Sequence, residues 1–120
     1  MWLLRDGAVL ASVDEAVSAS DHLRALRHRP PPAGAFLLRP PLLLHTLGLP
    51  YAVDVAFCED GSDGRMNVTE TVRLAPLRVA RPRPGTKMLV VAVQGAFERW
   101  HLAVGDELEI RGGDNGSSQP

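Results

Sequence analysis

Proline and glycine interrupt this chain so often that its apolar residues fall into short runs. The sequence holds 10 prolines and 11 glycines among 120 residues. Apolar runs of a few residues between such breaks are typical of short strands rather than of long helices. We therefore predict an α+β fold, in which a small, curved, partly closed barrel-like sheet, mostly antiparallel, is accompanied by one main helix and a short helical turn.

The length and composition predict one globular domain. Apolar residues make up 45% of the chain and charged residues 22%, which is close to average globular usage. A chain of this length can close one hydrophobic core but is too short to divide it. We expect the domain to span residues 1–111 and the Gly/Ser/Asn-rich residues 112–120 to form a flexible tail.

Turn residues and alternating apolar residues predict the strands. Asp6-Gly7 tolerates positive φ and predicts a tight hairpin between residues 2–4 and 9–13. Residues 53–58 and 66–74 predict a second hairpin around the turn-rich loop 60–64, with Met66, Val68, Val72 and Leu74 on one face. Further strands are expected at residues 35–38, 42–44 and 87–93, the last of these central, and residues 104–110 predict a turn followed by a strand. Residues 75–85 predict an extended Pro-rich connector.

Two helical segments are expected. Ser18 or Ser20 can cap a main helix that ends by Arg29, because the three prolines that follow cannot continue it. An alternative is a longer helix over residues 13–28, capped by Ser12. Residues 96–102 predict a short helical turn that places Phe97 and Trp100 in the core.

The charge balance and the N-terminus limit the classes of partner. A formal net charge of -1 gives no broad positive field, so we expect no nucleic-acid partner. The sequence has no stretch near the ~20 apolar residues of a membrane span, and its start lacks the apolar core of a signal peptide. We expect no membrane span and a cytoplasmic location.

Cysteine and histidine usage predicts neither a metal nor a cofactor. Cys58 is the single cysteine and lies in apolar sequence, which is typical of a buried small hydrophobic residue. The four histidines are scattered without metal-ligand spacing, at positions 22, 28, 45 and 101. We therefore predict no metal site, and no residue is assigned a catalytic role.

The most informative segment is residues 42–55, where a few polar residues interrupt apolar sequence. His45, Thr46, Gly48 and Asp54 are the candidate residues of a ligand-binding or structural polar site. Buried polar groups lose hydration and must find hydrogen bonds or face a cleft. If the chain reverses near Gly48, His45 and Asp54 can lie on neighbouring strands, where the carboxylate would orient the imidazole.

Several functions fit this segment. In one interpretation the polar side chains bond to backbone groups at a bend, and in another they line a pocket for a small ligand or a protein segment. The function we expect is that of a noncatalytic ligand- or protein-binding accessory module. The alternative is a hydrolase or transferase in which Asp54 orients His45 as general base. A third possibility is that the sheet edge or the connector 75–85 docks a partner chain.

The ordered set of features resembles a known family of small bacterial and archaeal proteins, the domain of unknown function family numbered 192. The resemblance covers residues 2–111. It rests on the following features: the opening at 2–7, the Arg-rich segment 23–27, His45-Thr46-x-Gly48, residues 53–57, Pro76, the Leu89-Val90 strand, Gly95, and Leu102-x-x-Gly105-Asp106-x-Leu108. The resemblance implies a compact α+β fold with a curved, barrel-like sheet, and it implies no particular reaction.

Three positions depart from the family pattern. Ala25 stands where the family usually has glycine, and Leu49 stands where it has methionine. Val91 replaces an acidic residue that is usual in the late central strand. If that acid contributes to a polar site with His45 and Asp54 in the family, this chain has a reduced version of the site.

Overall fold

The computed structural model describes residues 1–15, 34–39, 44–46, 49, 51–81 and 83–112. The predicted main helix up to Arg29 and the tail 113–120 lie outside these residues. The described elements are β1 (Trp2–Arg5), β2 (Ala8–Glu15), β3 (Ala35–Leu38), β4 (Leu44–His45), β5 (Val53–Asp60), the 3-10 turn η1 (Ser62–Gly64), β6 (Met66–Leu74), β7 (Val79–Ala80), β8 (Met88–Val93), α2 (Ala96–Trp100) and β9 (Glu107–Arg111).

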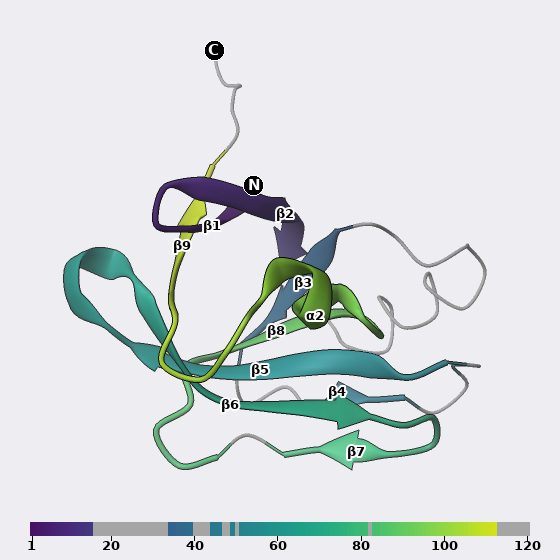
Figure 1. The fold of residues 1–120 in the computed structure, drawn as a ribbon. Helices are drawn as coiled ribbons and strands as arrows, with labels where there is room; N and C mark the ends of the chain where they lie inside the picture. The colour runs from purple at the N-terminus through teal and green to yellow at the C-terminus, as the bar shows by residue number, and fades with distance from the viewer. Residues whose placement is uncertain (16–33, 40–43, 47–48, 50, 82, 113–120) are drawn as a thin grey trace.

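Seven of these strands form a closed barrel in the order β1-β2-β3-β8-β5-β6-β9 (Figure 1). The pairing of β1 with β9 closes the barrel, so the closure is complete where we expected a partial one. The pair β2–β3 is parallel, and the other pairs described around the barrel are antiparallel. The predicted barrel-like, mostly antiparallel sheet is confirmed.

Both predicted hairpins are present. Arg5 pairs with Ala8 across a two-residue turn, in which Asp6 and Gly7 have φ values of 53° and 80°, as the prediction from the Asp-Gly pair requires. β5 and β6 form the second hairpin around η1. β8 pairs with β3 on one side and β5 on the other, which confirms it as a central strand.

The strand β2 continues to Glu15, so the alternative helix over residues 13–28 is wrong at its start. Ser12 pairs with Trp2 in the β1–β2 hairpin, and Val13 to Glu15 pair with β3. The ladder hydrogen bonds of two partner strands hold this segment extended, which a possible cap at Ser12 cannot outweigh.

The prediction that Met66, Val68, Val72 and Leu74 share one face is also wrong. The β5–β6 register shifts between Phe57 and Cys58, and Thr69 on β6 is left without a partner at that shift. This bulge reverses which face the later β6 residues occupy. The Thr69 hydroxyl donates a hydrogen bond of 3.1 Å to the Phe57 carbonyl, which fixes the bulge.

The bulge divides the apolar residues between two cores. Met66 and Val68 belong to the barrel interior, which also contains Leu3, Val13, Ala35, Leu37, Ala56, Cys58, Met88, Val90, Ala92, Ala96, Phe97 and Leu108. Val72 and Leu74 pack on a second cluster outside the barrel, made of Phe36, Leu38, Leu49, Val53, Val55, Phe57, Ala80, Leu89 and Val91. Strands β3, β5 and β8 are therefore buried on both faces, which explains their uninterrupted apolar sequences.

The two remaining strands and the helix cover the barrel. β4, which overlaps the strand predicted at 42–44, and β7, which lies within the predicted connector 75–85, form a separate two-stranded sheet. Ala80 of β7 belongs to the outer cluster, so this small sheet covers that cluster. Ala96 and Phe97 of α2 belong to the interior core, and Trp100 packs against it, as predicted for Phe97 and Trp100. In the described residues, none of the helices is long and apolar enough to cross a membrane.

Candidate functional site

Thr46 is fully buried and organises the connector that follows β6. Its hydroxyl donates to the Ala75 carbonyl at 2.6 Å and accepts the Arg78 N–H at 2.9 Å. Its backbone carbonyl accepts N–H groups from Leu49 and Leu77, and its own N–H donates to the Arg78 carbonyl. The side chain therefore binds backbone at a bend, which is the architectural role considered for it from sequence.

The other predicted residues do not assemble around Thr46. His45 lies in β4 opposite Val79 of β7, and Gly48 lies outside the described residues. Asp54 lies in β5, whose partners are β6 and β8. Because β4 pairs with β7 and not with β5, the expectation that His45 and Asp54 sit on neighbouring strands is wrong.

Asp54 is the polar group at the centre of a different site. Its side chain is 5% exposed. One carboxylate oxygen accepts the Nε–H of Arg73 at 3.1 Å, and the other accepts the backbone N–H groups of Gly95 at 3.0 Å and Phe97 at 3.2 Å. The carboxylate thus satisfies donors at the start of α2, in the way an N-cap residue does, from a neighbouring strand.

Strand register places these partners together. Asp54 pairs with Arg73 across the β5–β6 hairpin and with Ala92 across β5–β8. Just beyond Ala92 the chain leaves β8 and turns at Gly95, which has φ of 93°. This left-handed conformation favours glycine, and it aims the start of α2 back at Asp54. The hairpin and the turn after β8 therefore converge on one carboxylate.

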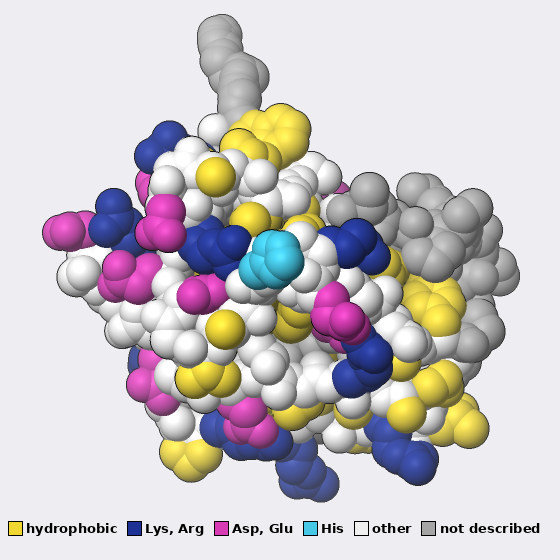
Figure 2. All heavy atoms as spheres, in the orientation of Figure 1, with side chains coloured by type: hydrophobic (Ala, Val, Ile, Leu, Met, Phe, Trp, Pro, Cys, Tyr) yellow, Lys and Arg dark blue, Asp and Glu magenta, His cyan; other side chains and the backbone are white. Residues whose placement is uncertain are grey.

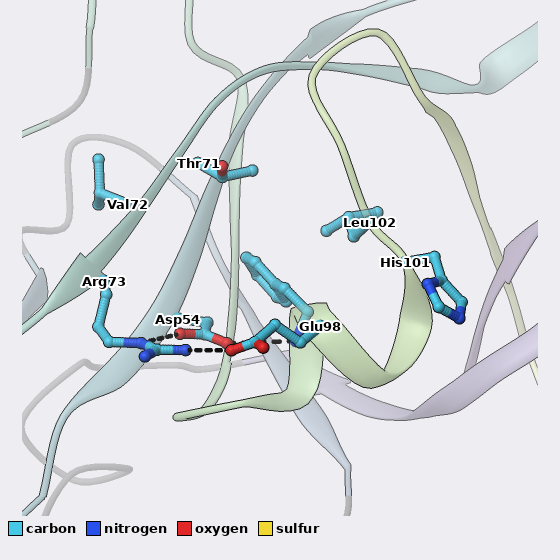
Figure 3. Close-up of a pocket in the computed structure, with 8 residues that line it drawn as sticks. Asp54, Thr71, Val72, Arg73, Glu98, His101 and Leu102 are labelled. Carbon is cyan, nitrogen blue, oxygen red and sulfur yellow. Dashed lines mark hydrogen bonds and ion pairs between the residues drawn. The ribbon is translucent and has the colours of Figure 1, made fainter.

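Arg73 joins this buried carboxylate to an exposed one. Its Nη2 lies 3.3 Å from a Glu98 carboxylate oxygen, and the Arg73 and Glu98 side chains are 44% and 81% exposed. Figure 3 shows the guanidinium facing the carboxylates of both Asp54 and Glu98, with a dashed line to each. The hydrogen bond to Asp54, followed by the one to Glu98, raises the pKa of Arg73 above its ordinary value. Arg73 is therefore fixed at one edge while its other edge reaches solvent.

An open pocket of about 600 Å³ lies beside these groups. It is lined by Asp54, Thr71, Val72, Arg73, Phe97, Glu98, His101 and Leu102, which come from β5, β6, α2 and the segment after α2 (Figure 3). Phe97 and Leu102 contribute apolar surface, and Arg73 and Glu98 contribute charge. Such a combination can hold a small molecule by its apolar body and orient it by a polar group.

Arg73, Glu98 and the N–H groups of α2 are absent from the site predicted from sequence, whereas Asp54 belongs to both. The sequence did contain one signal for Arg73. A hairpin that closes at loop 60–64 places residue 73 near residue 54, and oppositely charged residues that face each other across two strands attract. Glu98 had no such signal, since its position depends on how α2 packs on the barrel.

Cys58 is fully buried, and burial raises the pKa of its thiol to about 12, so it remains a neutral thiol. Among the described residues, no three His, Cys, Asp or Glu side chains lie together in a group that could hold a metal ion. His101 ends α2 in a left-handed conformation, apart from the three charged side chains in Figure 3.

Two solved structures share the fold. One is a crystal structure from Sinorhizobium meliloti 1021 described as a "putative transcription regulator", with a TM-score of 0.65, 19% identity, and coverage of 90% of this chain and 89% of that one. The other is a protein of unknown function from Novosphingobium aromaticivorans DSM 12444, with a TM-score of 0.57, 15% identity, and coverage of 82% and 73%. No protein-family profile matches the chain, and no curated protein matches its sequence. The chain therefore has the same fold as these two bacterial proteins.

Proposed function

We propose that this protein is a noncatalytic binding module that holds a small ligand in the pocket beside Asp54 and Arg73. The observation that carries the proposal is the arrangement of Arg73, whose Nε–H is held by a buried carboxylate while the guanidinium borders an open pocket. A guanidinium group fixed in this way loses little conformational entropy when its N–H groups bind an acceptor. The pocket of about 600 Å³ falls within the usual range for small-molecule sites.

The charges define the polar part of the ligand. Arg73 offers N–H donors, so the ligand presents a carboxylate, phosphate or carbonyl oxygen to it. Glu98 competes for the same guanidinium, but its 81% exposed side chain makes a weak ion pair that a ligand can displace. The apolar body of the ligand covers Phe97 and Leu102.

The state of Asp54 supports binding over catalysis. Both of its oxygens are occupied by donors that position Arg73 and α2, whereas a general base needs a free lone pair within reach of substrate. The separation of β4 from β5 in the strand order removes the basis for the hydrolase or transferase that pairs His45 with Asp54. The neutral thiol of Cys58 is a poor nucleophile.

The fold also supports the proposal that the chain belongs to the domain of unknown function family numbered 192, since that resemblance implies a curved, barrel-like sheet. A nucleic acid is not part of the proposal. Positive and negative side chains are intermingled across the face seen in Figure 2, and the net charge is -1. Phosphate backbones are bound by coherent positive surfaces instead.

Protein-observed NMR tests this function. A library of small carboxylates, phosphates, amines and neutral amides is titrated into ¹⁵N-labelled protein, and we expect the acceptor-bearing molecules with an apolar body to shift the amide signals of Val72, Phe97 and Leu102. The Arg73→Lys variant keeps the charge and loses the fork, so affinity falls roughly fivefold. The matched variant Arg81→Lys changes an exposed arginine outside the pocket and leaves the affinity unchanged.

A second variant probes the competition by Glu98. Glu98→Gln removes the exposed carboxylate that competes for Arg73 and disturbs no buried group. Acceptor-bearing ligands should therefore bind more tightly to this variant than to the unmodified protein. The proposal fails if no molecule in the library shifts signals confined to this pocket, or if Arg73→Lys and Arg81→Lys have the same effect on every molecule that does.

A further inference from the structure

The two ends of the barrel differ in how they are closed. At one end α2 inserts Ala96 and Phe97 into the interior core. At the other end three strands finish and two begin. Arg39 follows β3, Asp60 ends β5, and Ile110 is close to the end of β9. Met66 starts β6 and Met88 starts β8. A pocket of about 380 Å³ opens at this second end.

The floor of this barrel-mouth pocket is the interior core. Met66 and Met88 line the pocket and belong to the core of the barrel, where they are 6% and 4% exposed. Ile110 also lines it and packs against that core. Methionine side chains are flexible and polarizable, so they can adjust to an inserted apolar group. The open end of a small barrel is a usual place for one small ligand.

The rim of the pocket carries an excess of positive charge. Arg39, Arg65 and Lys87 line it together with a single carboxylate, that of Asp60. Arg39 also pairs with Glu15 at 3.1 Å, and both of those side chains are about half exposed, so this ion pair is weak. Within the described part of the chain, no ion pair joins Arg65 or Lys87 to another side chain, and the charge of Arg65 also acts on Glu109, whose pKa it helps to lower after the larger effect of Arg111. This local excess contrasts with a whole-chain net charge of -1.

We propose that the barrel mouth is a second binding site, separate from the Asp54 pocket, for a single-chain amphiphile with a carboxylate or phosphate head group. The head group pairs with Lys87 and Arg65 at the rim, and the apolar chain enters between Met66 and Met88. Neither half of the molecule is sufficient for tight binding, because an exposed ion pair contributes little alone and a neutral chain leaves the rim charges unpaired.

Octanoate and octyl phosphate are the probes, and NMR shifts of the amides of Gly64, Met66, Lys87 and Met88 report the binding. Both probes are expected to bind there. Acetate, which lacks the chain, and octylamine, which has the opposite charge, are expected to bind at least tenfold more weakly. The Arg65→Gln and Lys87→Gln variants each weaken octanoate roughly threefold, and the double variant roughly tenfold. Arg81→Gln removes an equal charge outside the pocket and leaves the affinity unchanged.

Three results would overturn the proposal. The first is that octanoate and octyl phosphate cause no shifts at the barrel mouth. The second is that Arg81→Gln weakens octanoate as much as Lys87→Gln does, which would indicate a nonspecific charge effect. The third is that anionic phospholipid vesicles bind the protein while the free amphiphiles do not, which would indicate a membrane surface instead. Because the exposed Arg65 and Lys87 side chains make no ion pair with the described residues, their variants should keep the unmodified melting temperature, which is measured alongside.

Discussion

Asp54 and Arg73 face each other across the β5–β6 hairpin, and their side chains meet at 3.1 Å between a carboxylate oxygen and Nε. Through its second oxygen the same carboxylate holds the N–H groups of Gly95 and Phe97. One buried acid therefore joins a strand pair, a helix start and a pocket wall. Asp54 therefore serves both the stability of the fold and the proposed ligand site, and variants can separate the two roles.

Replacing Asp54 with asparagine should destabilise the fold. The amide presents one acceptor oxygen and one donor group, so either Arg73 or the two backbone N–H groups face a donor. We expect the free energy of unfolding to fall by about 2 kcal/mol, measured by urea denaturation. Glu98→Gln is the control, because its exposed ion pair should contribute less than about 0.5 kcal/mol. Equal losses in the two variants would contradict the capping role of Asp54.

Replacing Thr46 with valine tests the architectural role of that hydroxyl. The change keeps the shape of the side chain, and it leaves the Arg78 N–H without its acceptor and the Ala75 carbonyl without its donor. The expected loss in unfolding free energy is about 2 kcal/mol. Thr46→Ser keeps the hydroxyl and should lose about 1 kcal/mol through its missing methyl group. If serine were the more damaging substitution, packing and not hydrogen bonding would explain the buried threonine.

Leu77 adopts a left-handed conformation with φ of 62° and is 64% exposed. A leucine is strained there, and it has little packing to lose. Leu77→Gly should therefore raise the free energy of unfolding by about 0.5 kcal/mol, the net of relieved strain and the added freedom of glycine in the unfolded chain. Leu77→Ala keeps the Cβ atom and should bring no gain. Thermal unfolding of both variants provides the measurement.

Cys58 should respond to pH only in the alkaline range. Burial raises the pKa of its thiol to about 12 from an ordinary value near 9, so the unfolded chain loses this proton first. The stability contributed by the neutral thiol is fully present below pH ~9 and is lost as the pH rises from there toward 12. We expect the Cys58→Ala variant to show a smaller alkaline decline in unfolding free energy than the unmodified protein. Rapid reaction of Cys58 with a thiol reagent at pH 8 in the folded state would instead indicate an accessible thiolate.

Local features of the fold could be predicted where a single residue pair decides the backbone. Asp6 and Gly7 both tolerate and adopt positive φ, and the hairpin they predicted is present. The uninterrupted apolar sequence of β8 predicted a central strand, and the spacing of Phe97 and Trp100 predicted a face packed on the core. In each case the information lies within a few residues of sequence.

Features that depend on distant pairing could not be predicted in the same way. The bulge at Thr69 moves Val72 to the outer cluster, and the sequence marks it only by the polar residues 69–71, which interrupt the apolar alternation between Val68 and Val72. The parallel β2–β3 pair joins segments separated by 19 residues, so it depends on where the chain returns. The candidate site in the structure differs from the predicted one because it also depends on distant contacts. Thr46 and Asp54 are close in sequence, but their side chains bind different elements.

The most direct test of the binding account is a crystal structure of the protein soaked with the best ligand from the NMR screen. The account predicts ordered ligand density with an oxygen within hydrogen-bond reach of the Arg73 guanidinium and an apolar group against Phe97. It also predicts that Asp54 keeps its bonds to Arg73, Gly95 and Phe97. Density located away from Arg73, or an Asp54 carboxylate released from the backbone N–H groups to contact the ligand, would contradict a noncatalytic module at this site.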